Sequence, residues 1–167
     1  MFFVRTAMEA DIPAVSELLD VTWHAAYDAI LGAEKVSAMV ASWHSPAAIK
    51  ARLARPGGEF LVADDGHRIG GMAYGILSKT HVDTINLHQL YVHPDCRRQG
   101  IGRDLFAEIE TCFPNAKRLV LEVVVGNAEA IAFYRAHGLV EAGETQNCGT
   151  SGSGIPAVIM EKELLHV

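Results

Sequence analysis

The stretch Leu87–Arg103 reads LHQLYVHPDCRRQGIGR, and the predicted fold is built around it. Its apolar-rich beginning, Leu87–Val92, is typical of a strand, which His93-Pro94-Asp95 ends. Arginines and two glycines follow, directly before an amphipathic helix. The start of a helix presents unpaired N–H groups and the positive end of the helix dipole, and glycines let the backbone approach a ligand closely. The stretch therefore predicts a turn that binds pyrophosphate between a strand and a helix.

Other phosphate-binding turns fit this stretch less well. A P-loop needs Gly-Lys-Ser/Thr, which is absent. A dinucleotide fingerprint needs a third glycine where Leu105 stands, and an acidic partner for the ribose after the next strand, where only Glu122 is near. A purely structural role for the turn would not explain why Arg97, Arg98 and Arg103 lie so close together in the sequence.

Composition predicts one soluble globular domain over residues 1–167, with 50% hydrophobic and 20% charged residues. No apolar run approaches the roughly 20 residues of a membrane span, and the first residues lack the features of a secretory signal. The three cysteines, Cys96, Cys112 and Cys148, form no CxxC pair, which favours a reducing cytoplasm. A net charge of −6 makes nucleic acid an unsuitable partner; the acidic charge either serves solubility alone or suits a cationic substrate.

The first half of the chain predicts a strand, three helical segments and then three strands. Asp11 is expected to cap a helix that Pro13 starts, and the run from Thr22 to form a second helical segment or an irregular helix pair that ends near Gly32. The other predicted elements are a strand at Phe2–Thr6, a helix from Ser45-Pro46 to Leu53, and strands at Glu59–Ala63, Arg68–Leu77 and Asp83–Val92.

The second half predicts two strand–helix units and a final hairpin. The helix from Ile101 is closed by Pro114, and Arg118–Val125 is predicted as a central strand buried on both faces. Asn127 caps a helix that ends at Gly138, and strands at Leu139–Thr145 and Ala157–Glu163 flank a mobile loop. The order β-α-α-α-β-β-β-α-β-α-β-β predicts an α+β fold with a single mixed, mostly antiparallel sheet flanked by helices.

Two motifs resemble the GNAT superfamily of N-acetyltransferases. The run LYVHPDCRRQGIGRDLF resembles its acetyl-CoA signature, whose Arg/Gln-x-x-Gly-x-Gly/Ala pattern is matched by Arg97, Gly100 and Gly102. The later run LEVVVGNAEAIAFYRAHGLVEAG resembles its second cofactor segment. The resemblance covers nearly the whole chain, and it implies the GNAT fold, acetyl-CoA as co-substrate and transfer of acetyl to a primary amine in a ternary complex. A non-catalytic acyl-CoA-binding sensor is the alternative.

The resemblance also implies a role for each matching residue. Backbone groups at the end of the fourth strand pair with the pantetheine arm, the N–H groups of residues 98–103 hold the pyrophosphate, and Asn127 with its helix lines the other side of the cofactor. Tyr134 matches the position whose hydroxyl protonates the departing CoA thiolate. The implied cofactor-binding residues are Leu90, Tyr91, Val92, Arg97, Arg98, Gln99, Gly100, Ile101, Gly102, Arg103, Asn127, Ala130 and Phe133.

The general base has more than one candidate. Glu122 is the one charge after Arg118 in an otherwise apolar strand, so its carboxylate is paired, hydrated or functional. It either deprotonates the acceptor ammonium, directly or through water, or it serves as a structural hydrogen-bond partner. His88 and Gln89 point to opposite sides of their strand, and His88 is either a base, a group that orders water, or a structural histidine. The spacing of the histidines predicts no metal site.

The acceptor is left open by the sequence. Tyr27 and Asp28 could hold a cationic amine, whereas Trp23 and Tyr27 could simply be core anchors one helical turn apart. The first half resembles polyamine acetyltransferases, and the second cofactor segment also resembles ribosomal-protein N-terminal acetyltransferases. A small-molecule or peptide amine is therefore the expected partner, and the resemblance also implies a homodimer.

Overall fold

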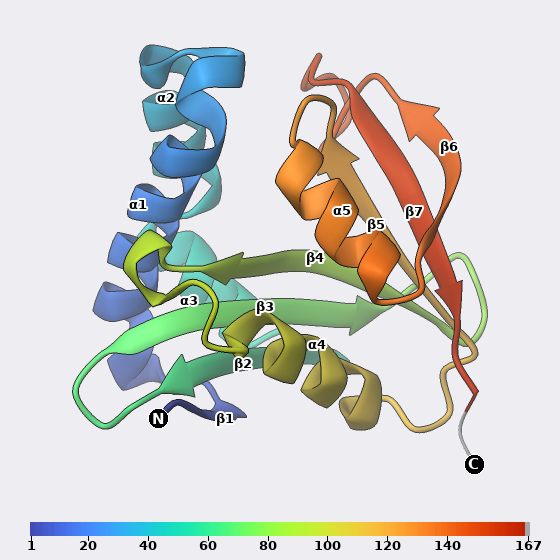
Figure 1. The fold of residues 1–167 in the computed structure, drawn as a ribbon, viewed down its shortest axis with the longest axis horizontal. Coiled ribbons are helices and arrows are strands. Elements are labelled where there is room, and N and C mark those ends of the chain that lie inside the picture. The colour runs from blue at the N-terminus through green and yellow to red at the C-terminus, as the bar shows by residue number, and fades with distance from the viewer. Residues whose placement is uncertain (166–167) are drawn as a thin grey trace. The chain divides into compact units, whose positions relative to one another are not determined.

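The computed structural model describes residues 1–165, which form one seven-stranded sheet in the order β1-β2-β3-β4-β5-β7-β6 (Figure 1). The pairs β1–β2, β5–β7 and β6–β7 are antiparallel, and β4–β5 is parallel. This confirms the predicted α+β class, the element order and the mixed sheet. The chain forms two compact units, residues 1–75 with 89–112 and residues 76–88 with 113 onward, and the single domain stays a prediction.

The first unit carries most of the helices. Its core includes the apolar faces of the first and fourth helices, among them Leu19 and Leu105, which are fully buried. Its elements are β1 (Phe3–Thr6), α1 (Ile12–Leu31), α2 (Ala33–Trp43), α3 (Pro46–Leu53), β2 (Gly58–Asp64), most of β3 (Ile69–Leu77), the end of β4 (Thr84–Val92) and α4 (Ile101–Cys112).

The first helix is longer than predicted. The segment from Thr22 to Leu31 was expected to begin a separate helical segment, but it continues α1 without interruption. No glycine or proline falls between residues 14 and 31, and the Thr22 hydroxyl donates to the Leu18 carbonyl at 2.8 Å. Gly32 ends the helix with φ +88°, a conformation that glycine adopts at little cost. The predicted helix end near Gly32 is therefore confirmed.

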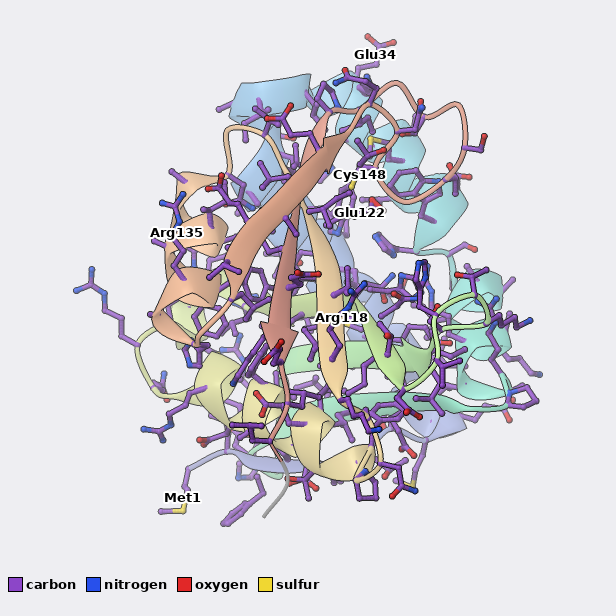
Figure 2. All side chains as sticks on the ribbon, turned by 90° about the vertical axis from the view of Figure 1, so that its right-hand side faces the viewer. Met1, Glu34, Arg118, Glu122, Arg135 and Cys148 are labelled. Carbon is purple, nitrogen blue, oxygen red and sulfur yellow. The ribbon has the colours of Figure 1, made fainter. Side chains whose placement is uncertain are left out.

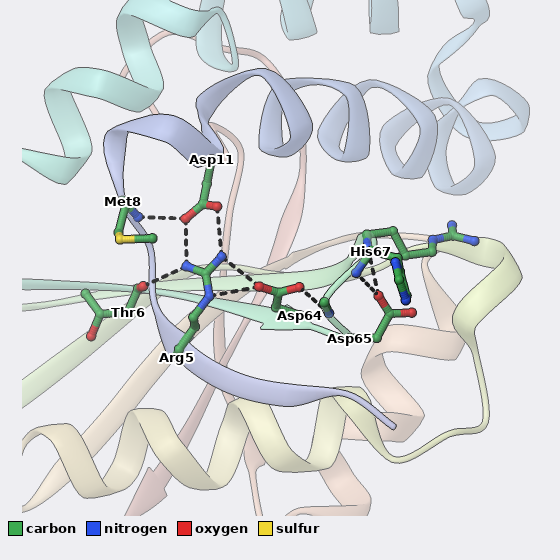
Figure 3. Close-up of polar contacts among 9 residues, drawn as sticks. Arg5, Thr6, Met8, Asp11, Asp64, Asp65 and His67 are labelled. Atoms are coloured by element: carbon green, nitrogen blue, oxygen red, sulfur yellow. Dashed lines mark hydrogen bonds and ion pairs between the residues drawn. The ribbon is translucent and has the colours of Figure 1, made fainter.

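Asp11 does not cap α1 with its side chain, which corrects the sequence prediction. Figure 3 shows that its carboxylate instead binds both terminal nitrogens of Arg5, at 2.8 and 2.9 Å, and accepts from the Met8 N–H at 2.7 Å. Arg5 also binds Asp64 on β2 through Nε and Nη2. The Arg5 hydrogen bonds, aided by the Met8 amide, hold the pKa of Asp11 below its ordinary value despite partial burial.

We expect Arg5→Ala to lower the free energy of unfolding by about 2 kcal/mol at pH 7, because the mostly buried Asp11 carboxylate loses its partner. Since the pKa of Asp11 is lowered in the folded state, its contribution is present above the ordinary aspartate pKa, about 4, and is lost as the pH falls further. Urea unfolding at pH 7 and at about pH 3 measures both effects. Arg68→Ala, at an exposed arginine, is the control; equal destabilisation by both variants would contradict the prediction.

The second unit contains β5 (Arg118–Val124), α5 (Ala128–Ala136), β6 (Val140–Thr145) and β7 (Ala157–Glu163). The expectation that β5 is buried on both faces is wrong, because Leu121 and Val123 are buried while Glu122 between them is exposed (Figure 2). Seven residue pairs join β5 to β7. The strand is therefore central in the sheet. The side chain of Glu122 points away from the strand, on a face of the sheet that is only partly covered.

The connection between β6 and β7 is closed by its own hydrogen bonds. The Cys148 N–H donates to the Ile155 carbonyl at 2.8 Å, and the Gly154 N–H donates to the Asn147 side chain at 3.0 Å. The predicted hairpin is confirmed by the antiparallel pairing of β6 with β7, and the mobility of its loop stays a prediction. Within residues 1–165, none of the helices combines the length and the apolar character that crossing a membrane requires.

Candidate active site

The end of β4 lies beyond the ladder that joins β4 to β5. That ladder has three residue pairs and finishes at Asn86 and Val120. Further along β4, Leu90, Tyr91 and Val92 are half-buried, whereas Ile85 and Leu87 are buried. The backbone groups of residues 90–92 are thus outside the β5 ladder, as expected for a segment whose backbone pairs with an extended ligand arm.

The beginning of the turn after β4 is held in place by His93. The His93 N–H donates to the Gly70 carbonyl at 2.8 Å, and the His93 ring accepts from the Asp95 N–H at 3.1 Å. Two residues of the turn have left-handed backbone conformations, Arg98 with φ +62° and Gly100 with φ +81°. Such values are uncommon for arginine, and they indicate that the path of the turn is imposed by its surroundings.

The first hydrogen bond of α4 runs from the Asp104 N–H to the Gly100 carbonyl at 3.0 Å. The N–H groups of Ile101, Gly102 and Arg103 precede it, so they have no acceptor within the helix. Arg97, Arg98 and Gln99 are exposed beside them, and the Arg103 guanidinium donates to Asp104 at 3.0 Å. Amides without helical acceptors, the positive helix end and exposed arginines together suit a pyrophosphate group.

Gly71 in β3 is a positioning residue that the sequence analysis missed. A Cβ at this position would lie 2.7 Å from Ile101 Cγ2, 3.0 Å from the Tyr91 carbonyl oxygen and 3.1 Å from Leu105 Cδ1. Only glycine therefore lets the first turn of α4 pack this closely on the sheet. The pair Gly70-Gly71 inside a predicted strand was the available signal, since glycines in a strand often mark a close approach.

Tyr27 and Asp28, the two residues of α1 that are predicted to bind the acceptor amine, lie in different surroundings. Tyr27 is 4% exposed and packs on Trp23, with ring centroids 4.8 Å apart. The Asp28 carboxylate is bonded to the His24 ring at 2.7 Å. Trp23 also packs against Trp43, His44 and Tyr91, which confirms it as a core anchor. The role of Tyr27 and Asp28 towards an acceptor stays a prediction.

Buried polar groups accompany this aromatic cluster. His44 is 1% exposed, and burial together with the nearby charge of Arg52 lowers its pKa to about 3, so it is neutral. The Arg52 guanidinium donates to the Trp43 carbonyl, and burial lowers its pKa. These groups therefore connect the end of α2 to α3, and His44 carries no charge there at neutral pH.

In the second unit, Asn127 and Tyr134 are at opposite ends of α5. The Asn127 side chain accepts from the Ala130 N–H at 3.2 Å, which confirms it as the helix cap. Tyr134 is 8% exposed, and its ring meets Phe133 edge-on with centroids 5.3 Å apart. The Leu139 N–H donates to the Tyr134 carbonyl at 3.0 Å, which fixes the last turn of the helix. Tyr134 is therefore held firmly in place.

The two candidate bases are both exposed. The Glu122 carboxylate accepts from the Gly149 N–H at 3.1 Å. His88 on β4 is exposed, while its neighbour Gln89 is half-buried, so the two side chains face opposite sides as expected. Among the described residues, no three histidine, cysteine or acidic side chains are placed to hold a metal ion.

Comparison with known proteins gives one family and several relatives. The model of the acetyltransferase (GNAT) family matches residues 17–139. The chain is 30% identical over 129 residues, 75% of its length, to the putative ribosomal protein bS18-alanine N-acetyltransferase of Bacillus subtilis, of which it covers 82%. It is 37% identical over 75 residues, 44% of its length, to the Escherichia coli ribosomal protein bS18-alanine N-acetyltransferase, and spans about half (51%) of that relative.

Solved structures give the same fold. The PaiA N-acetyltransferase of Thermoplasma acidophilum, solved in complex with coenzyme A, superposes with a TM-score of 0.85 at 20% identity. The match covers 98% of this chain and 99% of the other. At this identity the likeness concerns the fold alone.

Proposed function

Because the chain belongs to the acetyltransferase (GNAT) family and carries out acetyl-CoA-dependent N-acetyl transfer, we propose that it moves the acetyl group directly to a bound primary amine, within a ternary complex. The observation that carries the proposal is the start of α4, where three amides without helical acceptors lie beside Arg97 and Arg98. No comparison favours a non-catalytic acyl-CoA sensor.

Acetyl-CoA, when bound, supplies the acetyl thioester and a thiolate leaving group. We assign its pyrophosphate to the amides of residues 98–103, because those of Ile101, Gly102 and Arg103 have no acceptor within the helix. We assign its pantetheine arm to the backbone of Leu90–Val92, because this segment lies beyond the residue pairs that join β4 to β5. We also assign Asn127 and α5, including Ala130 and Phe133, to cofactor binding. This assignment is supported by the motif that these residues match.

Two proton transfers accompany direct transfer to an amine. The acceptor ammonium must lose a proton before its nitrogen can attack, and we assign Glu122 as the base because its carboxylate is exposed and held in place by the Gly149 amide. The leaving thiolate must gain a proton, and we assign Tyr134 as the acid because its phenol can donate one and its helix end is fixed. His88 is the alternative base.

We propose a peptide N-terminus as the acceptor. This is supported by the Bacillus subtilis relative, whose name specifies alanine of a ribosomal protein and of which this chain covers 82%. A smaller amine is the second candidate, since Asp20 and Asp28 give α1 an exposed acidic face around His24.

An acceptor panel tests the function. Purified protein with acetyl-CoA is offered a peptide with an N-terminal alanine, spermidine, free lysine and an aminoglycoside, with release of thiol and the mass of the product as readouts. We expect the N-terminal-alanine peptide to gain one acetyl group fastest. Tight CoA binding without acetylation of any amine would overturn the enzymatic function, and a faster reaction of spermidine would overturn only the acceptor.

We also propose a cytoplasmic location and a homodimer. The location is supported by Cys96, Cys112 and Cys148, all of which carry free thiols. The dimer rests on the family resemblance alone, and sedimentation equilibrium at micromolar concentration measures it directly.

A further inference from the structure

The carboxylate of Glu122 is held by a segment that follows it by 27 residues. Its Oε2 atom accepts from the Gly149 N–H at 3.1 Å, and Gly149 belongs to the β6–β7 connection, residues 146–156. Figure 2 shows the side chains of Glu122 and Cys148 close together in the second unit. Cys148 and Gly149, two adjacent residues of this connection, therefore both lie beside the Glu122 carboxylate.

The second contact comes from the Cys148 thiol. Burial, followed by the negative charge of Glu122 and a hydrogen bond with it, raises the pKa of the thiol to about 11. The thiol therefore keeps its proton at neutral pH and acts towards the carboxylate as a donor. A thiol in this state is a poor nucleophile and a poor target for oxidation, so a redox role does not explain it.

The loop is built to present these two donors. Gly149 has φ +78°, in the left-handed region, which directs its N–H towards Glu122 at a cost that only glycine avoids. The Cys148 N–H is bonded to the Ile155 carbonyl, and the Thr150 N–H to the Cys148 carbonyl at 2.9 Å. The conformation of residues 148 and 149 is thus set by the loop itself, before any ligand binds.

We propose that Cys148 is a positioning residue: its thiol, together with the Gly149 amide, fixes the orientation in which the Glu122 carboxylate takes the proton of the acceptor ammonium. An ionised carboxylate offers about four acceptor positions, so two donors orient it and leave capacity for a substrate proton. In this step an N–H bond of the ammonium breaks and the proton moves to Glu122. The inference rests on the proposed role of Glu122 as the base.

The experiment compares Cys148→Ala, Cys148→Ser, Glu122→Gln and the double variant Glu122→Gln/Cys148→Ala. The acceptor is the amine of the panel that the wild type acetylates fastest. We expect Glu122→Gln to lower kcat about 100-fold, and Cys148→Ala to lower it roughly fivefold because the base then keeps only the Gly149 amide as its donor. Serine keeps a donor, so Cys148→Ser should stay within about twofold of the wild type.

The double variant separates positioning from packing. If Cys148 acts through Glu122, removing the thiol from Glu122→Gln should change kcat by less than about 1.5-fold. A purely structural role would lower kcat by the same factor in both backgrounds, with a matching fall in melting temperature, and would overturn the inference. Unchanged kcat in Cys148→Ala, with Glu122→Gln impaired, would also overturn it. Unchanged kcat in Glu122→Gln would overturn the base itself, and with it the positioning role.

Discussion

Tyr134→Phe should lower kcat by about 100-fold while changing the affinity for CoA by less than threefold. The substitution removes only the hydroxyl, which is the proposed proton donor to the leaving thiolate, and general acid catalysis contributes about 10² to 10⁴ in rate. The ring and its edge-on contact with Phe133 are retained, so α5 should keep its packing. Steady-state kinetics with saturating acetyl-CoA and calorimetry with CoA measure the two quantities.

A matched control is Tyr74→Phe, which removes the hydroxyl of another buried tyrosine, on β3, whose ring faces Phe60 at 5.6 Å. It should leave kcat within about twofold of the wild type. If Tyr134→Phe lowered kcat and CoA affinity by the same factor, the hydroxyl would serve cofactor binding or packing, and the assignment as the acid would be wrong.

Gly71→Ala should destabilise the protein by about 2 kcal/mol and weaken CoA binding roughly tenfold. The new methyl group would lie 2.7 Å from Ile101 and 3.0 Å from the backbone of Tyr91, so either α4 or the end of β4 must move, and overpacking of this kind typically costs 1–3 kcal/mol. Ile101 begins α4, so its displacement also moves the amides proposed to hold the pyrophosphate. Urea unfolding and calorimetry with CoA measure the two effects.

Gly143→Ala is the control for this substitution, since a Cβ there would meet only Ile159 Cδ1, at an ordinary 3.8 Å. It should change both stability and CoA affinity little. Loss of stability in Gly71→Ala with unchanged CoA affinity would show that the start of α4 does not bind the cofactor.

The features that sequence predicted well depend on local chemistry. The turn before α4 needs a glycine at Gly100 with positive φ, and Asn127 caps α5 through an amide three residues away, so both are visible within a few residues. The glycine break after α1 is local in the same way. Tyr134 was found by motif resemblance and Glu122 as a charge in an apolar strand, and their catalytic roles stay predictions.

The features that were missed depend on partners distant in sequence. Asp11 was expected to cap a helix, but its carboxylate forms an ion pair with Arg5. Arg5 in turn forms an ion pair with Asp64, which lies on another strand. Glu122 was expected in a buried strand, whereas its carboxylate is exposed and bound by a loop that follows 27 residues later. Gly71 matters because of Ile101, which comes thirty positions later. Local propensity carries no information about such contacts.

The aromatic cluster on α1 and α2 has a practical consequence for spectroscopy. Trp23 and Trp43 are the only two tryptophans of the chain, and their rings lie 5.8 Å apart in an edge-on arrangement within the first unit. Intrinsic tryptophan emission excited at long wavelength therefore reports melting of that unit alone. A denaturation curve recorded in this way does not report the unfolding of α5 and β7. Circular dichroism, or a tryptophan introduced at Phe133, is needed to measure whether both units unfold together.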